Sequence, residues 1–331
     1  MGIAPATPPP WHTWSSWTGR CPMSRTPMRW IPTDIGDGAE QGATVTRRDP
    51  ILSKAGAIRP FLLSPMRRIT RGHTIARARR PQRIGLITDF GPGPYIGQIR
   101  LLLAAAAPAV AVVDLISDLT PFRPDLAGYV LPGLLRGMPG HTLYLCVVDP
   151  GVGSGRGILA ARIGTDWLLA PDNGLLSPLL SQAAKSAAPY RDLWRVDWRP
   201  SMASASFHGR DIFTPIAQQI LAGRLPPASP IELAAMVGAG MPPTLATVCY
   251  LDHYGNAMTG IPARTVGSDC VVSVGGVRLP RARTFSDVPV GGAFWYENAF
   301  GLLEIAVNQG RADTQLGLRP GDPVSLHPEP A

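Results

Sequence analysis

The chain has 331 residues, with 31 Lys and Arg against 23 Asp and Glu, and its formal net charge is therefore +8. With 45% hydrophobic and 16% charged residues, it is neither a wholly disordered chain nor a coiled coil. The longest nearly apolar run, 101–113, is interrupted by Pro108 and is too short to span a bilayer. The 4 cysteines show no CxxC spacing, which argues against a zinc site or disulfide framework and favours reduced thiols in a cytoplasmic protein.

The positive charge is confined to the N-terminal quarter of the chain. Residues 1–83 carry a net charge of +10, and the remaining 248 residues carry −2. The basic quarter is rich in Pro, Trp and Arg without helix or strand periodicity, which predicts a disordered extension over 1–82. Sequence upstream of a true start such as Met66, an Arg-rich targeting peptide and a weak polyanion-binding arm are the alternatives. No nucleic-acid-binding motif accompanies the charge, so we expect no sequence-specific nucleic-acid binding.

From residue 84 onwards, buried-strand and helix patterns alternate. Apolar, often β-branched runs predict strands at 84–88, 109–116 and 143–148. Apolar residues at helical spacing predict helices at 95–107 and 125–135. Continuous apolar strands that alternate with helices are typical of a parallel sheet covered on both faces. We therefore predict an α/β domain with a mostly parallel sheet over 83–240.

The pattern changes again after about residue 225. Five prolines flank a short helical stretch at 231–236, which indicates a connection between domains. Strand-like runs follow, at 246–251, 271–279, 293–296 and 302–307, the second of them with a Gly-Gly hairpin turn. Closely spaced strands with glycine turns predict a small antiparallel β-barrel or sandwich, and we assign a small β-barrel domain to 241–331.

Two aspartates directly follow predicted strands of the α/β domain. Asp89 ends the first strand and Asp149 ends the third. Because ligands of such sheets bind outside the carboxyl ends of the strands, both side chains should face one crevice. Asp89 is suited to accept both hydroxyls of a ribose, although a helix N-cap or turn explains it equally well.

The segment VVDPGVGSGR, residues 147–156, is glycine-rich but matches neither of the common phosphate-binding glycine patterns. It places Asp149 and Arg156 seven residues apart on a tight loop. The two side chains can fold back into an ion pair that points the guanidinium at a water or an anion. A purely structural clasp of the loop is the alternative.

Two further segments, FHGRDIF and LDHYGN, carry polar groups that a core does not need. His208 begins an apolar helix, where an isolated histidine is more often structural than catalytic. Asp252, Tyr254 and Asn256 follow a strand and suit a ligand with an ammonium group and a flat ring, with turn formation as the alternative. Segment 172–174 is interpreted as a plain turn. The sequence shows neither a nucleophile elbow nor a metal-ligand cluster.

The order of these segments is more specific than any one of them. TDFG, GPYIG, VVDPGVGSGR, APDNGLL, FHGRDIF, LDHYGN and NAFGLLEIAVNQG follow one another between residues 88 and 310. The series resembles the S-adenosyl-L-methionine (SAM) hydroxide adenosyltransferase family, the SAM hydrolases related to the fluorinase and chlorinase. The resemblance implies attack of an activated water on C5′ of the adenosyl group, which releases adenosine and L-methionine without a metal or cofactor.

The resemblance also implies residue roles and an assembly. Asp149 would orient Arg156, and Arg156 with His208 would polarise the water. Asp89 matches the acid that binds the ribose, and Phe122 matches the apolar wall beside it. Asp252 matches the acid at the methionine ammonium. Tyr254 and Asn256 match the aromatic and the amide that contact the adenine. The family is trimeric, which implies a homotrimer with each site between the α/β domain of one subunit and the barrel of its neighbour.

Two alternatives to hydrolysis are considered. A SAM-dependent halogenase of the same family lacks the residues that this chain keeps at Asp149, His208 and Gly209, so hydrolysis is favoured. The other alternative is a SAM or adenosine sensor without turnover. The chain also departs from the family pattern: 299–300 is Ala-Phe where a serine is usual, residue 254 is Tyr instead of Phe, and residue 117 is Ser where His is frequent. The first two departures concern affinity for the methionine end of the substrate.

Overall fold

The computed structural model describes residues 72–76, 80–186, 190–267 and 270–328. The extension predicted to be disordered therefore lies largely outside the described residues. Within its predicted bounds, however, β1 (His73–Thr74) pairs antiparallel with β8 (Arg224–Leu225). Ile75, which follows β1, is buried. Packed structure thus starts ahead of residue 83, the predicted start of the α/β domain.

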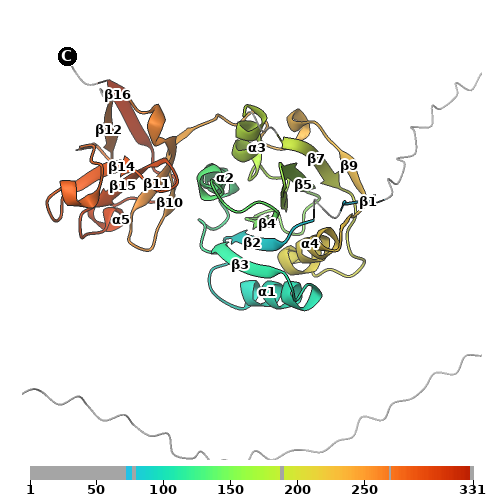
Figure 1. Ribbon diagram of the computed structural model, residues 1–331. Coiled ribbons are helices and arrows are strands. Elements are labelled where there is room, and N and C mark those ends of the chain that lie inside the picture. The colour runs from blue at the N-terminus through green and yellow to red at the C-terminus, as the bar shows by residue number, and fades with distance from the viewer. Residues whose placement is uncertain (1–71, 77–79, 187–189, 268–269, 329–331) are drawn as a thin grey trace, which may run out of the picture. The chain divides into compact units, whose positions relative to one another are not determined.

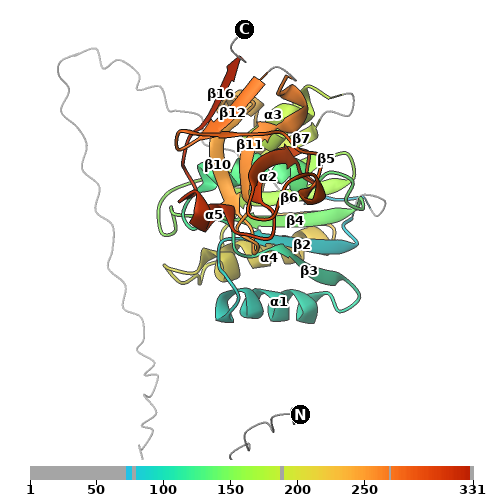
Figure 2. The same cartoon turned by 90° about the vertical axis from the view of Figure 1, so that its left-hand side faces the viewer.

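The central element is a seven-stranded mixed sheet with the order β3-β2-β4-β6-β5-β7-β9 (Figures 1 and 2). Its strands are β2 (Arg83–Thr88), β3 (Ala111–Ile116), β4 (Thr142–Val147), β5 (Ile158–Ile163), β6 (Asp166–Pro171), β7 (Tyr190–Val196) and β9 (Ala228–Pro230). The predicted parallel pairing is confirmed across β3, β2, β4 and β6. β5, β7 and β9 are antiparallel additions. The tight connection at 164–165 was not among the predicted features. It is too short for a parallel crossover and makes β5 and β6 a hairpin.

Helices cover both faces of this sheet, as the apolar strand pattern predicts. On one face lie α1 (Pro94–Ala106) and α4 (Thr214–Leu221), and on the other α2 (Pro124–Leu134) and α3 (Ser177–Ala184) (Figure 1). Each of these helices has a proline in its first turn, where the missing N–H has no intrahelical partner in any case.

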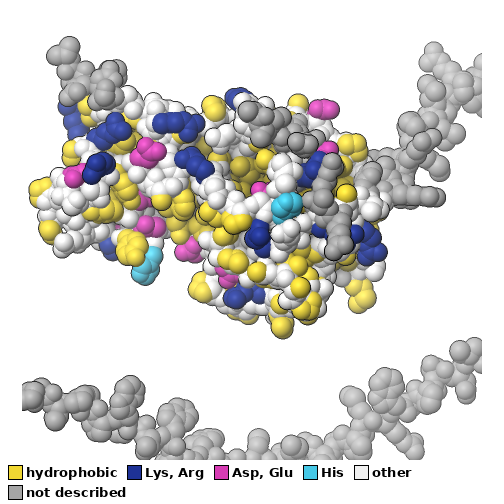
Figure 3. Space-filling model, in the orientation of Figure 1, with side chains coloured by type: hydrophobic (Ala, Val, Ile, Leu, Met, Phe, Trp, Pro, Cys, Tyr) yellow, Lys and Arg dark blue, Asp and Glu magenta, His cyan; other side chains and the backbone are white. Residues whose placement is uncertain are grey.

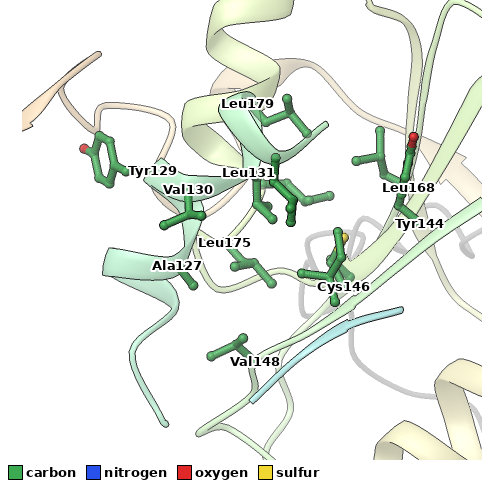
Figure 4. Close-up of a cluster of buried hydrophobic side chains, with 14 of the residues drawn as sticks. Ala127, Tyr129, Val130, Leu131, Tyr144, Cys146, Val148, Leu168, Leu175 and Leu179 are labelled. Carbon is green, nitrogen blue, oxygen red and sulfur yellow. The ribbon is translucent and has the colours of Figure 1, made fainter. Parts of the chain in front are cut away.

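The hydrophobic core between α2, α3 and the sheet is drawn in Figure 4. Val130 and Leu131 come from α2, and Cys146 comes from β4. Val148 and Leu175 belong to the segments that follow β4 and β6, and both are fully buried. The core therefore extends to the carboxyl edge of the sheet, so that the polar residues at this edge are anchored on a packed base.

The C-terminal part consists of two antiparallel sheets. The first has the order β10-β11-β15-β14 and comprises β10 (Leu245–Leu251), β11 (Ala257–Pro262), β15 (Leu302–Val307) and β14 (Ala293–Glu297). The second has the order β13-β12-β16 and comprises β13 (Val277–Leu279), β12 (Cys270–Val274) and β16 (Val324–Pro328). Single bridges at Thr247–Pro323 and Arg281–Trp295 are isolated contacts outside these ladders. The predicted antiparallel architecture is confirmed, whereas the described strands form no closed sheet.

The remaining elements are short. The helical stretch predicted at 231–236 is a single 3₁₀ turn, η3 (Leu233–Ala235), and α5 (Ala312–Gln315) follows β15. In the part of the chain that the structure describes, no helix has both the length and the apolar character needed to cross a membrane.

Candidate active site

Asp89 and Asp149 emerge side by side at the carboxyl edge of the sheet, as predicted. They follow the adjacent strands β2 and β4, whose last residues, Thr88 and Val147, are paired in register. Burial raises the pKa of Asp89 and the nearby Asp149 carboxylate raises it further, although hydrogen bonds oppose the shift. One of these comes from the N–H of Phe122, 2.9 Å from Asp89 Oδ2.

The loop after Asp149 folds back on itself. The N–H of Gly151 donates to Asp149 Oδ1 at 3.2 Å. The Ser154 hydroxyl donates to the Gly151 carbonyl at 2.7 Å and accepts from the N–H of Arg156 at 3.3 Å. Gly153 has a φ of 84°, a left-handed conformation that favours glycine. The glycines of this loop thus serve a tight return, which brings residue 156 back to residue 149.

The predicted ion pair between Asp149 and Arg156 forms, and it is buried. Arg156 Nε lies 2.7 and 2.8 Å from the two carboxylate oxygens, and Nη2 donates to Oδ2 as well. The side chains of Arg156 and Asp149 are 7% and 2% exposed. Such a pair compensates for its lost hydration only with this multiple hydrogen bonding.

His208 joins the pair from a different part of the chain. Its Nδ1 lies 3.1 Å from Arg156 Nη2. The residue directly precedes a short π-helix, η2 (Gly209–Phe213), which continues into α4. A side chain at Gly209 would come within 3.0 Å of the Phe90 ring, so glycine lets this turn lie close against that ring. Single π-turns of this kind are frequent at functional sites.

The contact with Arg156 decides which nitrogen of His208 carries the proton. A guanidinium can only donate, so Nδ1 must accept, and the proton of the neutral ring lies on Nε2. Burial lowers the pKa of His208, and the Arg156 charge lowers it further, with Asp149 acting in the opposite direction. His208 therefore presents a neutral N–H donor at its outer nitrogen.

One nitrogen of the Arg156 guanidinium makes no hydrogen bond within the described residues. Its Nη1 is buried and has no hydrogen-bond acceptor among the described protein atoms, while the guanidinium carbon lies 5.2 Å from the centre of the Phe213 ring. Buried donors without a partner are rare, and a bound water or a catalytic role is among the explanations for one. The arrangement can hold a water or an anion beside two donors, Arg156 Nη1 and His208 Nε2.

The second predicted group lies in the loop between β10 and β11. Asp252 Oδ1 accepts from the N–H of Asn256 at 2.8 Å, and Oδ2 accepts from its side-chain amide at 3.0 Å. Asn256 is buried, whereas Tyr254 is 71% exposed. These residues line a hollow of about 690 Å³ together with Phe285, Tyr296, Val307, Gln309 and others. The predicted acid, aromatic and amide are thus brought together.

The group at the carboxyl edge of the sheet and the group in the loop between β10 and β11 make no direct polar contact within the described residues. Across the described ranges, no hydrogen bond or ion pair connects Asp89, Asp149, Arg156 or His208 with the group around Asp252. The remaining predicted residue, Phe122, belongs with Asp89. Its ring is 72% exposed and its φ is 63°, an uncommon value for a non-glycine residue.

Sequence reasoning missed three residues with contacts at these groups. Asn173 donates to the carbonyl of Val148 at 2.9 Å, and Arg199 donates to the carbonyl of Arg156 at 2.7 Å. Glu304 is 2% exposed and accepts from the Tyr296 hydroxyl and from Asn298 Nδ2, the latter at 2.7 Å. Burial raises the pKa of Glu304. Asn173 and Glu304 lie within APDNGLL and NAFGLLEIAVNQG, so their place in these segments could have identified them as candidates. Arg199 lies in none of the segments, and no sequence signal points to it.

Comparison with known families gives a match over most of the folded part. Residues 84–229 match the family model described as the SAM hydroxide adenosyltransferase N-terminal domain, and residues 246–325 match the one described as its C-terminal domain. The two candidate groups fall one into each matched region.

Curated relatives and solved structures agree with this match. The (R)-S-adenosyl-L-methionine hydrolase of Thermus thermophilus is 37% identical over 253 residues, which cover 72% of this chain and 97% of that protein. That of Salinispora arenicola is 33% identical over 256 residues, or 73% and 97%. The crystal structure of a conserved hypothetical protein, also from Thermus thermophilus, is similar with a TM-score of 0.59 at 34% identity, covering 75% of this chain and 100% of that one. The crystal structure of an uncharacterized conserved protein from Thermotoga maritima is similar with a TM-score of 0.63 at 27% identity. The match covers 73% of this chain and 99% of that one.

Proposed function

Because the chain belongs to the SAM hydroxide adenosyltransferase family, we propose that it hydrolyses S-adenosyl-L-methionine to adenosine and L-methionine. The oxygen of a water attacks C5′ and the bond between C5′ and sulfur breaks. Its electron pair goes to the sulfonium, which becomes the neutral thioether of methionine, and one proton of the water is released. The observation that carries the proposal is the buried set of Asp149, Arg156 and His208 at the carboxyl edge of the sheet.

The chemistry demands little beyond placement and charge. A sulfonium is already a good leaving group, so the sulfur needs no acid. Arg156 Nη1 and His208 Nε2 donate to the attacking oxygen and stabilise its hydroxide character. Asp149 holds Arg156 in place. Because Arg156 occupies His208 Nδ1, we assign His208 the role of a donor that orients the water, with the released proton passing to solvent.

The substrate is held by the other predicted residues. Asp89 accepts the ribose hydroxyls, beside Phe122. Asp252 meets the ammonium group, and its two oxygens, each engaged once by Asn256, retain lone pairs for this contact. Tyr254 and Asn256 bind the adenine in the hollow lined by the loop between β10 and β11, by Tyr296 of β14 and by the end of β15. An exposed aromatic ring at Tyr254 is suited to stacking on a purine.

We further propose that the active protein is a cytoplasmic homotrimer in which each site combines two subunits. The lack of any polar contact between the two groups among the described residues supports a site completed by a neighbour. No metal or cofactor is assigned, since the proposed chemistry has no step that requires one. The halogenase alternative is disfavoured by Asp149 and His208, which the halogenase branch replaces.

The two relatives are named (R)-S-adenosyl-L-methionine hydrolases, after one sulfonium epimer, and we propose the same preference here. Purified full-length protein is incubated separately with the (R) and (S) sulfonium epimers, and adenosine is followed by chromatography. We expect adenosine from the (R) epimer above the spontaneous rate, and no 5′-halogenated nucleoside in chloride or fluoride. Tight binding of SAM without adenosine would instead establish a sensor.

Two variants test the roles within this reaction. We expect Asp149→Asn and His208→Ala each to lower kcat by about 10²- to 10⁴-fold, because the water loses an oriented donor. Asp192→Asn is the matched control, since Asp192 pairs with Arg162 away from the site. Near-normal turnover in either site variant would show that the water-activating assignment is wrong even if SAM is the substrate.

A further inference from the structure

The loop that carries Asp149 and Arg156 has to cross another strand of the sheet. It connects β4 with β5, and β6 lies between these two strands in the sheet. The loop therefore passes over the carboxyl end of β6. The turn at 172–174, which follows β6 and was interpreted from sequence as a plain turn, lies where this crossing takes place.

A side chain of this turn holds the beginning of the loop. Asn173 Nδ2 donates to the carbonyl of Val148 at 2.9 Å, one residue before Asp149. Val148 is fully buried, so without this donor its carbonyl would face the interior unpaired. The Asn173 amide is itself fixed, because its Oδ1 accepts from the N–H of Leu175 at 3.2 Å.

The backbone of the same turn holds the end of the loop. The N–H of Asp172 donates to the carbonyl of Gly157 at 3.0 Å, one residue after Arg156. Asp172 is buried and in turn accepts from Arg195 at 3.0 Å and from the N–H of Val237 at 2.8 Å. A side chain at Gly157 would come within 3.3 Å of both Asp172 and Arg195, so the packing here is close. The loop is thus tied at both ends to one turn.

We propose that Asn173 is a positioning residue for catalysis, which fixes the start of the loop so that Asp149 holds Arg156 against His208. The inference rests on the proposed hydrolysis and deepens it. Because Asn173 fixes the carbonyl of Val148, it also restricts the movement of the Asp149 carboxylate one residue further on. Misplacement of a reacting group by about 1 Å costs up to about 100-fold in rate. Asn173 touches neither the water nor the substrate in this proposal.

His208 offers a readout that a merely structural role would not move. The charged groups that act on it are Arg156, Asp149, Arg199 and Asp211. Of these, Arg156 and Asp149 belong to the clamped loop, and Arg156 has the larger effect of the two, lowering the pKa of His208. If the loop relaxes, the contact between Arg156 and His208 lengthens. The pKa of His208 then rises towards the ordinary histidine value.

The experiment compares full-length Asn173→Ala with Ser177→Ala. Ser177 is a buried residue of the next helix whose hydroxyl donates to the Gly238 carbonyl, so its variant also loses one side-chain-to-carbonyl hydrogen bond but leaves the loop untouched. Asn173→Asp is a second test variant that keeps the shape and removes the donor. We measure kcat and KM for SAM, and the titration of His208 by NMR, assigned with His208→Ala among the 6 histidines.

We expect both Asn173 variants to lower kcat by about 10- to 100-fold with KM little changed, and to raise the pKa of His208. Ser177→Ala should lose thermal stability without either effect. Asn173 variants that match Ser177→Ala in kcat and in the His208 titration would overturn the proposal. The titration of His208 needs no substrate. If the wild-type protein shows no turnover but the Asn173 variants still shift the pKa of His208, the hydrolase function is refuted and the positioning role of Asn173 is retained.

Discussion

His208 is held neutral by its neighbours, and this state is central to the proposed chemistry. Its burial and the Arg156 charge lower its pKa, and Arg156 occupies Nδ1. Protonation would place a second positive charge against the guanidinium and remove the acceptor at Nδ1. The neutral ring and the intact set of three residues therefore belong together.

This argument predicts an acid limit of activity. Because the pKa of His208 lies below the ordinary value of 6.5, the neutral donor persists below pH 6.5, and turnover should fall only at lower pH. A group with a lowered folded-state pKa of this kind also destabilises the fold as pH falls through 6.5, since the unfolded chain binds the proton first. A profile of kcat against pH checks the first point. A midpoint above 6.5 would contradict it.

The residues of the site differ in how far sequence reasoning reaches them. Asp149 and Arg156 were predictable as a pair, because one tight glycine loop contains both. Asn173 was not, because its partner is a backbone carbonyl that only the strand order brings near. The residue types at Asp252 and Tyr254 indicated an ammonium group and a flat ring, and only the resemblance identified these as parts of SAM. Local pattern thus finds pairs within one loop, and topology is needed for the rest.

Among the elements, the strands and helices between 84 and 148 were predicted closely, and those directly after them were missed. β5 contains Arg162, a buried side chain that pairs with Asp192 of β7. A charged residue interrupts the apolar run by which a buried strand is identified, although its partner neutralises it in the fold. The order of β4, β6 and β5, which places the loop with Asp149 and Arg156 over β6, could therefore not be predicted.

Close helix packing at the site's base gives a prediction at the same scale. In α2, a side chain at Gly128 would lie 2.8 Å from the Leu175 carbonyl, just after the turn that holds the loop. We expect Gly128→Ala to lower the free energy of unfolding by about 1–3 kcal/mol, since backbone must move to make room. The measurement is urea denaturation.

A glycine in another helix provides the control. Gly97 in α1 has open space around the same position, so Gly97→Ala should raise the free energy of unfolding by about 0.5–1 kcal/mol through helix propensity alone. Equal effects of the two substitutions would show that contact at α2 is not what requires glycine there.

For the whole molecule, the net charge of +8 is an average over two unlike regions. The first 83 residues carry +10 and the rest −2. On the face drawn in Figure 3, acidic and basic side chains of the described residues are interspersed without one dominant basic patch. This face of the folded part therefore gives no electrostatic argument for a nucleic-acid partner.

The proposed assembly predicts rescue between two inactive proteins. His208→Ala removes one half of the site and Asp252→Ala the other. If each site combines two subunits, random assembly of equal amounts of the two variants restores about a quarter of all sites, because two intact halves meet with that frequency. Co-expression followed by the adenosine assay measures this. Sites built within single chains would stay inactive in every mixture, and each variant alone is the control.

The buried carboxyl group of Glu304 bears on what happens after bond cleavage. It lies behind Tyr296, which lines the same hollow as Asp252. In the proposed reaction the substrate arrives with a sulfonium charge, whereas the departing methionine carries a neutral sulfur. The acidic groups around this hollow attract the first more strongly than the second, to the extent that Glu304 is ionised. We therefore expect only weak inhibition by methionine, because the reaction removes the sulfonium charge that helped to bind the substrate.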